Sequence, residues 1–211
     1  MTIQSNPLYE KMKALMPTSV PDIRHPAGAR QRLLAAALRR FGEEGAVAVN
    51  LEEVRLQAGV SVGALYHHFA DKGALVEALY ADVTARFQTG FLDVLRTSPS
   101  AEDGIRRAVR YFLRWVQRHR HETAILLGTR AESPALDELN RRFFAEVMAW
   151  WRTHAHYGVV KPLPLELIHA LWLGPAQEYT RHWFAGHAKR SPVAVGAMLE
   201  EAAWNALKED P

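Results

Sequence analysis

The stretch that decides the fold is residues 49–74, VNLEEVRLQAGVSVGALYHHFADKGA. Asn50 is a favourable N-cap residue, so a helix is expected to begin directly after it. Gly59 follows about two turns later, at the place where the residue after a helix often takes a positive φ. Ser61 then caps a second short helix and Asp71 caps a third. The pattern predicts two very short helices joined by a tight glycine turn.

Helices of this length are marginal in water on their own, so they must pack on their neighbours. Val54, Leu65 and Phe69 are available for the inner face, and His68 is expected to be a packing residue as well. The preceding segment carries apolar residues at helical spacing and predicts a longer helix over residues 30–41. Three helices in this order are the plan of a helix-turn-helix domain, whose second motif helix enters the major groove of DNA.

The outward residues of the second short helix suit that placement. Its first residues are small enough to let the helix N-terminus approach base edges: Val62, Gly63 and Ala64. Tyr66 and His67 carry polar tips that suit phosphate, and Lys72 adds a cation at the start of the next helix. Positive helix N-termini also favour phosphate oxygens.

At these residues the sequence resembles the tetracycline-repressor (TetR) family of bacterial regulators. The resemblance rests on the pattern A-G-V-S-x-G-x-L-Y-x-H-F-x-x-K, matched here between Ala58 and Lys72, and on a preceding helix that ends in FGEEG. It implies that Asn50, Tyr66, His67 and Lys72 contact phosphates. It also implies that the base-facing end of the motif helix is formed by Ser61, Val62, Gly63 and Ala64.

Two residues depart from the family pattern. Arg55 stands where the family usually has a small residue, so its guanidinium is expected to splay outward. Gly73 replaces a helix-favouring acidic residue, which weakens the first turn of the next helix by about 1 kcal/mol relative to Ala. These departures keep open an alternative function, a helical interaction or adaptor protein that has kept the fold without operator binding.

The rest of the chain is also helical in pattern, so the fold class is all-α. Apolar residues surround the segments 165–184 and 193–207 on more than one face, and Gly174-Pro175 should kink the first of them. Two such helices from each of two subunits would form a four-helix bundle in a homodimer. Residues expected at that interface are Leu171, Tyr179, Met198, Leu199, Ala202 and Trp204.

In the family, the C-terminal part is a helical ligand-binding and dimerisation domain, and aromatic residues and histidines are concentrated there in this chain. They predict a pocket for a small apolar or aromatic effector. Its candidate lining residues are Trp115, His119, Trp150, Trp151, His154, His169, Trp172 and Trp183. No metal site is expected, because His154 and His156 face opposite sides of a helix.

Composition and motifs limit the remaining functions. The 211 residues hold 48% apolar residues and no cysteine, with a net charge of +3, which indicates a soluble, cytoplasmic protein without disulfides. No 18-residue apolar stretch predicts a membrane span, and no catalytic or cofactor motif indicates an enzyme. The predicted organisation is an extension over 1–26, a DNA-binding domain over 27–87 and a body over 88–211. We expect a repressor that binds a palindromic operator in double-stranded DNA and is released by its effector.

Overall fold

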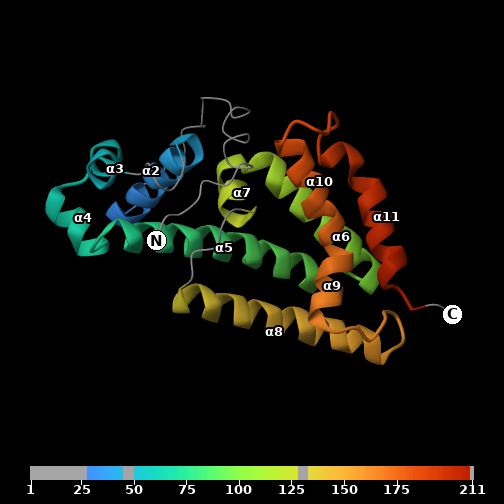
Figure 1. Ribbon diagram of the computed structural model, residues 1–211. Helices are drawn as coiled ribbons and strands as arrows, with labels where there is room; N and C mark the ends of the chain where they lie inside the picture. The colour runs from blue at the N-terminus through green and yellow to red at the C-terminus, as the bar shows by residue number, and fades with distance from the viewer. Residues whose placement is uncertain (1–27, 45–49, 128–132, 210–211) are drawn as a thin grey trace. The chain divides into compact units, whose positions relative to one another are not determined.

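The computed structural model describes residues 28–44, 50–127 and 133–209, and these residues are helical almost throughout (Figure 1). The described residues form no β-strand, only an isolated bridge between Val160 and Lys208. The all-α prediction is therefore confirmed. No helix among the residues placed here is both long and apolar enough to cross a membrane. The predicted extension over 1–26 lies outside the described residues.

Contacts divide the chain into two compact units, and each is described by itself. The first unit takes the described residues up to Thr84 together with those of Arg120–Leu136. Besides the first residues of α8 (Pro134–His156), it contains four whole helices and the N-terminal half of another. These are α2 (Ala29–Glu44), α3 (Leu51–Ala58), α4 (Val62–His68), α7 (Arg120–Leu127) and the start of α5 (Lys72–Arg96). The functional domain boundary at residues 87/88 stays a prediction.

Helix α2 is the centre of the first unit, because α3, α4 and α7 all pack on it. Its inner face buries Leu33, Leu34 and Phe41, the residues whose helical spacing predicted the element. The guanidinium of Arg32 donates a hydrogen bond of 3.1 Å to the carbonyl oxygen of Ala58, which ties α2 to the end of α3. The short motif helices thus have the support that their length requires.

The second unit takes Ala85–His119 and the chain from Asp137 onward. It contains the end of α5, most of α8 (Pro134–His156) and the C-terminal elements. Its other helices are α6 (Ala101–Arg118), α9 (Leu165–Trp172), α10 (Gly174–Phe184), a 3₁₀ turn η2 (Val193–Val195) and α11 (Gly196–Leu207). Helix α11 packs along α6 and also contacts α9 and α10.

The predicted kink at Gly174-Pro175 is a break between two helices. Helix α9 ends at Trp172, Leu173 forms the junction, and α10 begins at Gly174 with Pro175 in its first turn. Proline has no backbone N–H and clashes with the carbonyl four residues earlier, so an unbroken helix cannot continue there. The first turn of a helix tolerates proline, which explains why α10 starts at this point.

The core of the second unit is built on α6. This helix buries an apolar face that includes Ile105, Val109 and Phe112, and it turns arginines outward. Trp172 of α9 lies against this face and donates its indole N–H to the carbonyl oxygen of Ile105 at 3.1 Å. Gly104 leaves space for a second indole, since a Cβ there would lie 2.5 Å from Cζ2 of Trp150.

Candidate nucleic-acid interface

The caps that define the motif helices are confirmed by the structure. The Asn50 side chain accepts a hydrogen bond of 2.9 Å from the Glu52 N–H, which begins α3. Gly59 ends α3 with φ 61° and ψ 42°, the left-handed conformation that a Cβ disfavours. Ser61 accepts from the Ala64 N–H at 3.2 Å and so begins α4. Asp71 accepts from the Ala74 N–H at 2.8 Å and does the same for α5.

One face of the turn anchors the motif. Val54, Leu65 and Phe69 are buried, as their positions in the sequence predict, and Val60 of the turn is buried as well. The guanidinium of Arg30 lies 5.8 Å from the centre of the Phe69 ring, a cation–π contact that holds α2 against the end of α4. The orientation of α4 is therefore fixed by its buried side chains.

The opposite face of α4 is open. Its exposed residues are Ser61, Val62, Gly63, Tyr66 and His67, and Ala64 is half-buried. Val62 is 53% exposed and Tyr66 is 56% exposed, although both are large apolar or aromatic residues. A helix start with free backbone N–H groups and small side chains can approach a polyanion closely, and aromatic hydroxyl tips can donate to phosphate oxygens.

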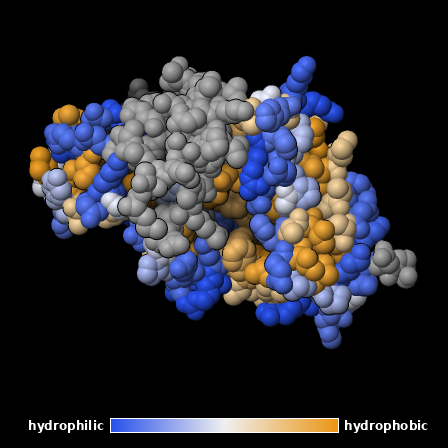
Figure 2. All heavy atoms as spheres, in the orientation of Figure 1, coloured by the Kyte–Doolittle hydropathy of each residue, from blue (hydrophilic) through white to orange (hydrophobic). Residues whose placement is uncertain are grey.

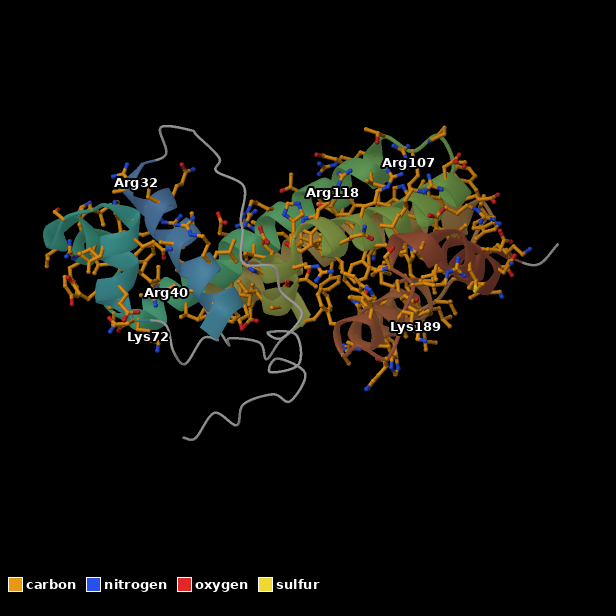
Figure 3. All side chains as sticks on the ribbon, turned by 90° about the horizontal axis from the view of Figure 1, so that it is seen from above. Arg32, Arg40, Lys72, Arg107, Arg118 and Lys189 are labelled. Atoms are coloured by element: carbon orange, nitrogen blue, oxygen red, sulfur yellow. The ribbon has the colours of Figure 1, made fainter. Side chains whose placement is uncertain are left out.

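Basic side chains belong to the same unit. Figure 3 labels Arg32 and Arg40 on α2 and Lys72 at the start of α5. Arg40 forms an ion pair with Glu53 of α3. Asn50, which the family resemblance places at a phosphate, is exposed at the start of α3. All eight predicted contact residues therefore lie either at the starts of α3, α4 and α5 or on the exposed face of α4.

The expectation that Arg55 splays outward is wrong. Its side chain is only 17% exposed and folds along the turn, where one guanidinium nitrogen donates to the Val60 carbonyl oxygen at 2.8 Å. A second nitrogen donates to Glu52 at 2.8 Å, and this hydrogen bond lowers the pKa of the Glu52 carboxyl. The long side chain therefore bridges α3 and the turn, and it does not obstruct the crossing of the two motif helices.

The expectation that His68 is a packing residue is also wrong. Its side chain is exposed, and its ring meets the neighbouring rings of His67 at 5.1 Å and Phe69 at 6.3 Å between centroids. The physical reason is the shortness of α4. Leu65 and Phe69, four residues apart, already fill the inner face of this helix. His68, which lies between them in the sequence, therefore faces solvent.

Several aromatic candidates of the second unit meet in a cluster and in a pair. Trp150, Trp151 and Trp172 form the cluster, with Trp150 and Trp172 stacked at 5.9 Å between ring centroids. His154 joins it 4.3 Å from Trp150, and burial lowers the pKa of its imidazole. The pair is made by Trp115 and His119, which stack at 4.9 Å.

His169 and Trp183 contact residues outside the cluster. His169 is exposed and lies 3.3 Å from the Gln177 amide, while Trp183 meets the ring of Phe184. Sequence reasoning missed Gln88, which is 6% exposed and whose amide N–H donates to Asn140 at 2.8 Å. Its side-chain carbonyl is buried without a hydrogen-bond partner among the described residues. Helical spacing gave a signal, because Gln88 shares the buried stripe of Phe91 and Leu95.

The predicted dimer residues differ in exposure. Met198 is 70% exposed and Leu171 38% exposed, and Ala202 is exposed as well. Figure 2 shows apolar side chains gathered at the surface over α9 and α11. The other three residues are half-buried: Tyr179, Leu199 and Trp204. The Tyr179 hydroxyl donates to the Arg190 carbonyl oxygen at 2.9 Å and so fixes the loop after α10.

Comparison with known proteins supports the class and shows which family the motif region matches. The capped turn, the exposed short helix and its supporting helices define a helix-turn-helix protein, and residues 33–79 match the family model of bacterial regulatory proteins, tetR family. The HTH-type transcriptional regulator BetI of Escherichia coli is 33% identical over 82 residues, which are 38% of this chain and 42% of BetI. The chain thus spans less than half the length of the curated relatives that it matches.

Solved structures share the fold over most of the chain. A TetR family transcription regulator from Marinobacter aquaeolei VT8 has a TM-score of 0.72 at 19% identity, covering 86% of this chain and 96% of that one. The regulator FadR from Bacillus subtilis, in complex with stearoyl-CoA, has a TM-score of 0.67 at 14% identity, covering 82% and 96%. The chain thus matches the tetR family model over residues 33–79 and shares its overall fold with solved regulators of that family.

Proposed function

We propose that this chain is a DNA-binding transcriptional regulator whose α4 enters the major groove. The observation that carries the proposal is the exposed start of α4, where small residues stand on a helix held from behind by Leu65 and Phe69. Tyr66, His67 and Lys72 contact phosphates at its edges, and Ser61 to Ala64 face the bases. BetI, which is 33% identical over 82 residues, is named a transcriptional regulator.

The test is the salt dependence of DNA binding. Fragments selected from random DNA supply an operator, and affinity for it is then measured over a range of salt concentrations. Each phosphate contact contributes about one unit of slope in log affinity against log salt. Lys72→Ala should weaken specific and non-specific binding alike and lower the slope by about one. An adaptor protein that has lost operator binding would select no sequence and show no slope, and this result would overturn the proposal.

The proposed regulator acts as a homodimer on a palindromic operator. Exposed Met198 and Leu171 support an interface on α9 and α11, because an isolated subunit would leave these side chains in water. Met198→Asp should yield monomers with weakened operator affinity, whereas Ala194→Asp changes another exposed residue of the same unit and should leave the mass of the dimer intact. A native chain that light scattering shows to be monomeric at micromolar concentration would refute this arrangement.

Regulation is proposed to come from a small apolar or aromatic effector that releases the DNA, so that the protein is a repressor. The aromatic cluster and the unpaired Gln88 carbonyl support an effector that offers a hydrogen-bond donor on an apolar body. The FadR structure that shares this fold holds stearoyl-CoA, a ligand with a long apolar chain. Release requires the effector to bind more tightly to the DNA-free state, since equal affinity for both states shifts nothing.

Gln88→Met tests the effector site in two measurements. It removes a buried unpaired acceptor together with the hydrogen bond to Asn140, so the free energy of unfolding should change by no more than about 1 kcal/mol. Effectors found by tryptophan fluorescence that carry a donor should bind more weakly, and effectors without a donor should bind as before. Trp172→Ala is a poorer test, because truncating this buried, hydrogen-bonded side chain costs about 3–5 kcal/mol of stability. An effector that binds equally well with and without operator would exclude the release mechanism.

A further inference from the structure

A groove on the second unit lies away from the aromatic cluster. It has a volume of about 220 Å³ and runs between α6 and the η2–α11 segment. Its apolar surface comes from Leu113, Val193 and Ala197, with Gly196 at the start of α11. Its charged residues are Arg110, Arg114 and Glu200. None of these residues belongs to the predicted effector or dimer sets.

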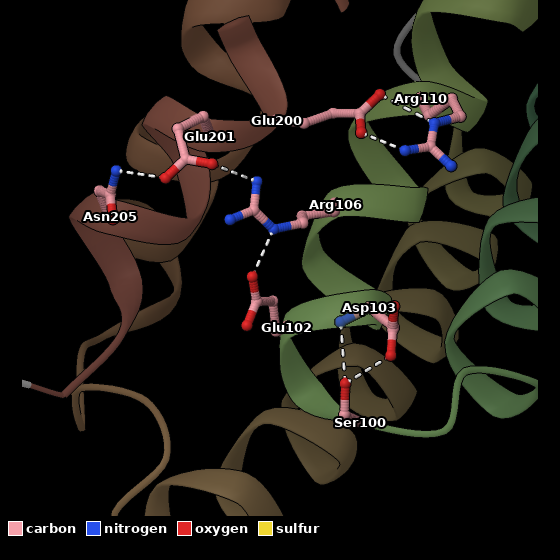
Figure 4. A network of polar contacts seen from close by, with 8 residues as sticks. All are labelled: Ser100, Glu102, Asp103, Arg106, Arg110, Glu200, Glu201 and Asn205. Atoms are coloured by element: carbon pink, nitrogen blue, oxygen red, sulfur yellow. Dashed lines mark hydrogen bonds and ion pairs between the residues drawn. The ribbon is translucent and has the colours of Figure 1, made fainter. Parts of the chain in front are cut away.

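The walls of the groove are held in place by ion pairs between α6 and α11 (Figure 4). Arg110 donates through two guanidinium nitrogens to Glu200, one of them at 2.9 Å, and Glu200 is only 5% exposed. Arg106 bridges Glu102 at 2.7 Å and Glu201 at 2.7 Å. The groove is therefore formed before any ligand arrives, which reduces the entropy that binding costs.

The charge of the lining selects the ligand. Arg110 is neutralised by Glu200, whereas Arg114 is exposed and forms no ion pair or hydrogen bond with the described residues. Two arginines and one glutamate leave one net positive charge on the lining. A guanidinium binds a carboxylate through two parallel hydrogen bonds, and the adjoining wall of Leu113, Val193 and Ala197 suits a short hydrocarbon.

We propose that this groove binds a small amphipathic monocarboxylate, with its carboxylate on Arg114 and its hydrocarbon against Leu113, Val193 and Ala197. The volume is below the 300–1,000 Å³ or so of common drug-sized pockets, so the hydrocarbon is short. A dianion would bring a second negative charge close to Glu200, and a neutral ligand would leave Arg114 unpaired. The site does not depend on DNA binding or on the effector site proposed above.

The direct test is NMR titration of the full chain with hexanoate, compared with hexanamide at the same concentrations. Hexanoate should shift the backbone amide signals of Val193–Ala197 and the Arg114 side-chain signal with a Kd on the order of a millimolar, as expected for a ligand of this size. Hexanamide has the same hydrocarbon without the charge and should bind about tenfold more weakly or worse, because charge-assisted hydrogen bonds are the stronger ones.

Two variants and one control complete the test. Arg114→Gln should weaken hexanoate binding about tenfold, while Arg118→Gln removes another exposed arginine of α6 that does not line the groove and should leave it unchanged. Gly196→Ala adds a methyl at ordinary contact distance, 3.6 Å from Leu113 and Glu200, so the protein should fold and the groove should bind more weakly.

Thermal unfolding of each variant checks that the fold is retained. Equal binding of hexanoate and hexanamide would overturn the proposal, because the charge would then play no part. Wild-type affinity in Arg114→Gln, or hexanoate shifts that avoid Val193–Ala197, would overturn it as well.

Discussion

Gly63→Ala should affect stability and operator binding with opposite signs. Gly63 is the second residue of α4, and a Cβ built there meets no atom within 4 Å. Alanine should therefore stabilise the helix, by about 0.5–1 kcal/mol according to the propensity difference from glycine. In the complex, the added methyl would stand between the helix start and the base edges. Loss of one good base contact costs about 1–3 kcal/mol, and each 1.4 kcal/mol is about a tenfold loss of affinity.

Gly73→Ala is the matched control, because Gly73 is also the second residue of a capped helix. Its Cβ would lie 3.1 Å from the Asp71 side chain, which needs to move by only a few tenths of an ångström. Urea unfolding should show that neither variant is destabilised by as much as 1 kcal/mol. Fluorescence anisotropy should show weaker operator binding for Gly63→Ala only, with non-specific binding unchanged. A folded Gly63→Ala protein with wild-type operator affinity would refute the placement of α4 against the bases.

Three further predictions concern the free energy of unfolding. Gly59→Ala should lower it by about 1–2 kcal/mol in urea, because φ is 61° and no neighbouring atom lies within 4 Å to add a clash. Gly104→Ala should lower it too, since overpacking against Trp150 costs about 1–3 kcal/mol and the helix gain is about 1 kcal/mol at most. In a Trp150→Leu background that loss should largely disappear, and a double-mutant cycle measures the difference. Burial raises the pKa of Tyr111 to about 12. The contribution of the neutral Tyr111 side chain to the free energy of unfolding should therefore be complete below pH about 10 and be lost as the pH rises to about 12. Tyr111→Phe should reduce this alkaline loss, and ultraviolet absorbance should show one tyrosine fewer that ionises late.

The helix-turn-helix motif could be predicted from the sequence because the features that determine it are local. Each of the three capping side chains accepts from a backbone N–H two or three residues away: Asn50, Ser61 and Asp71. Position 59 requires glycine because its φ is positive. Such rules depend on residue type and short spacing, which a sequence displays directly. Arg55 escaped them because a long side chain selects its partners among several within reach, and here it selected the Val60 carbonyl oxygen.

The body could be predicted only in outline. Helical patterns and the break at Pro175 were visible, but the pairing of helices depends on contacts between distant residues. Gln88 and Asn140 are 52 positions apart, and Arg110 and Glu200 are 90 apart. No spacing rule links such residues, so aromatic composition indicated a cluster without saying which of its candidates meet. Trp172 meets Trp150, and His169 lies beside Gln177.

The ion pairs between α6 and α11 bear on how the body keeps one arrangement. In the pair of Arg110 and Glu200 only the carboxylate is buried, and the pair adds little net stability, because removing the carboxylate from water costs about as much as the attraction returns. A shifted α11 would lose that attraction and still bury the carboxylate, so incorrect registers are penalised by several kcal/mol. The pair thus selects the register of α11 on α6 more than it stabilises the fold. The same register sets the groove beside Arg114 and presents Met198 at the surface, so the ion pairs of Arg110 with Glu200 and of Arg106 with Glu201 position two of the surfaces proposed here to bind partners.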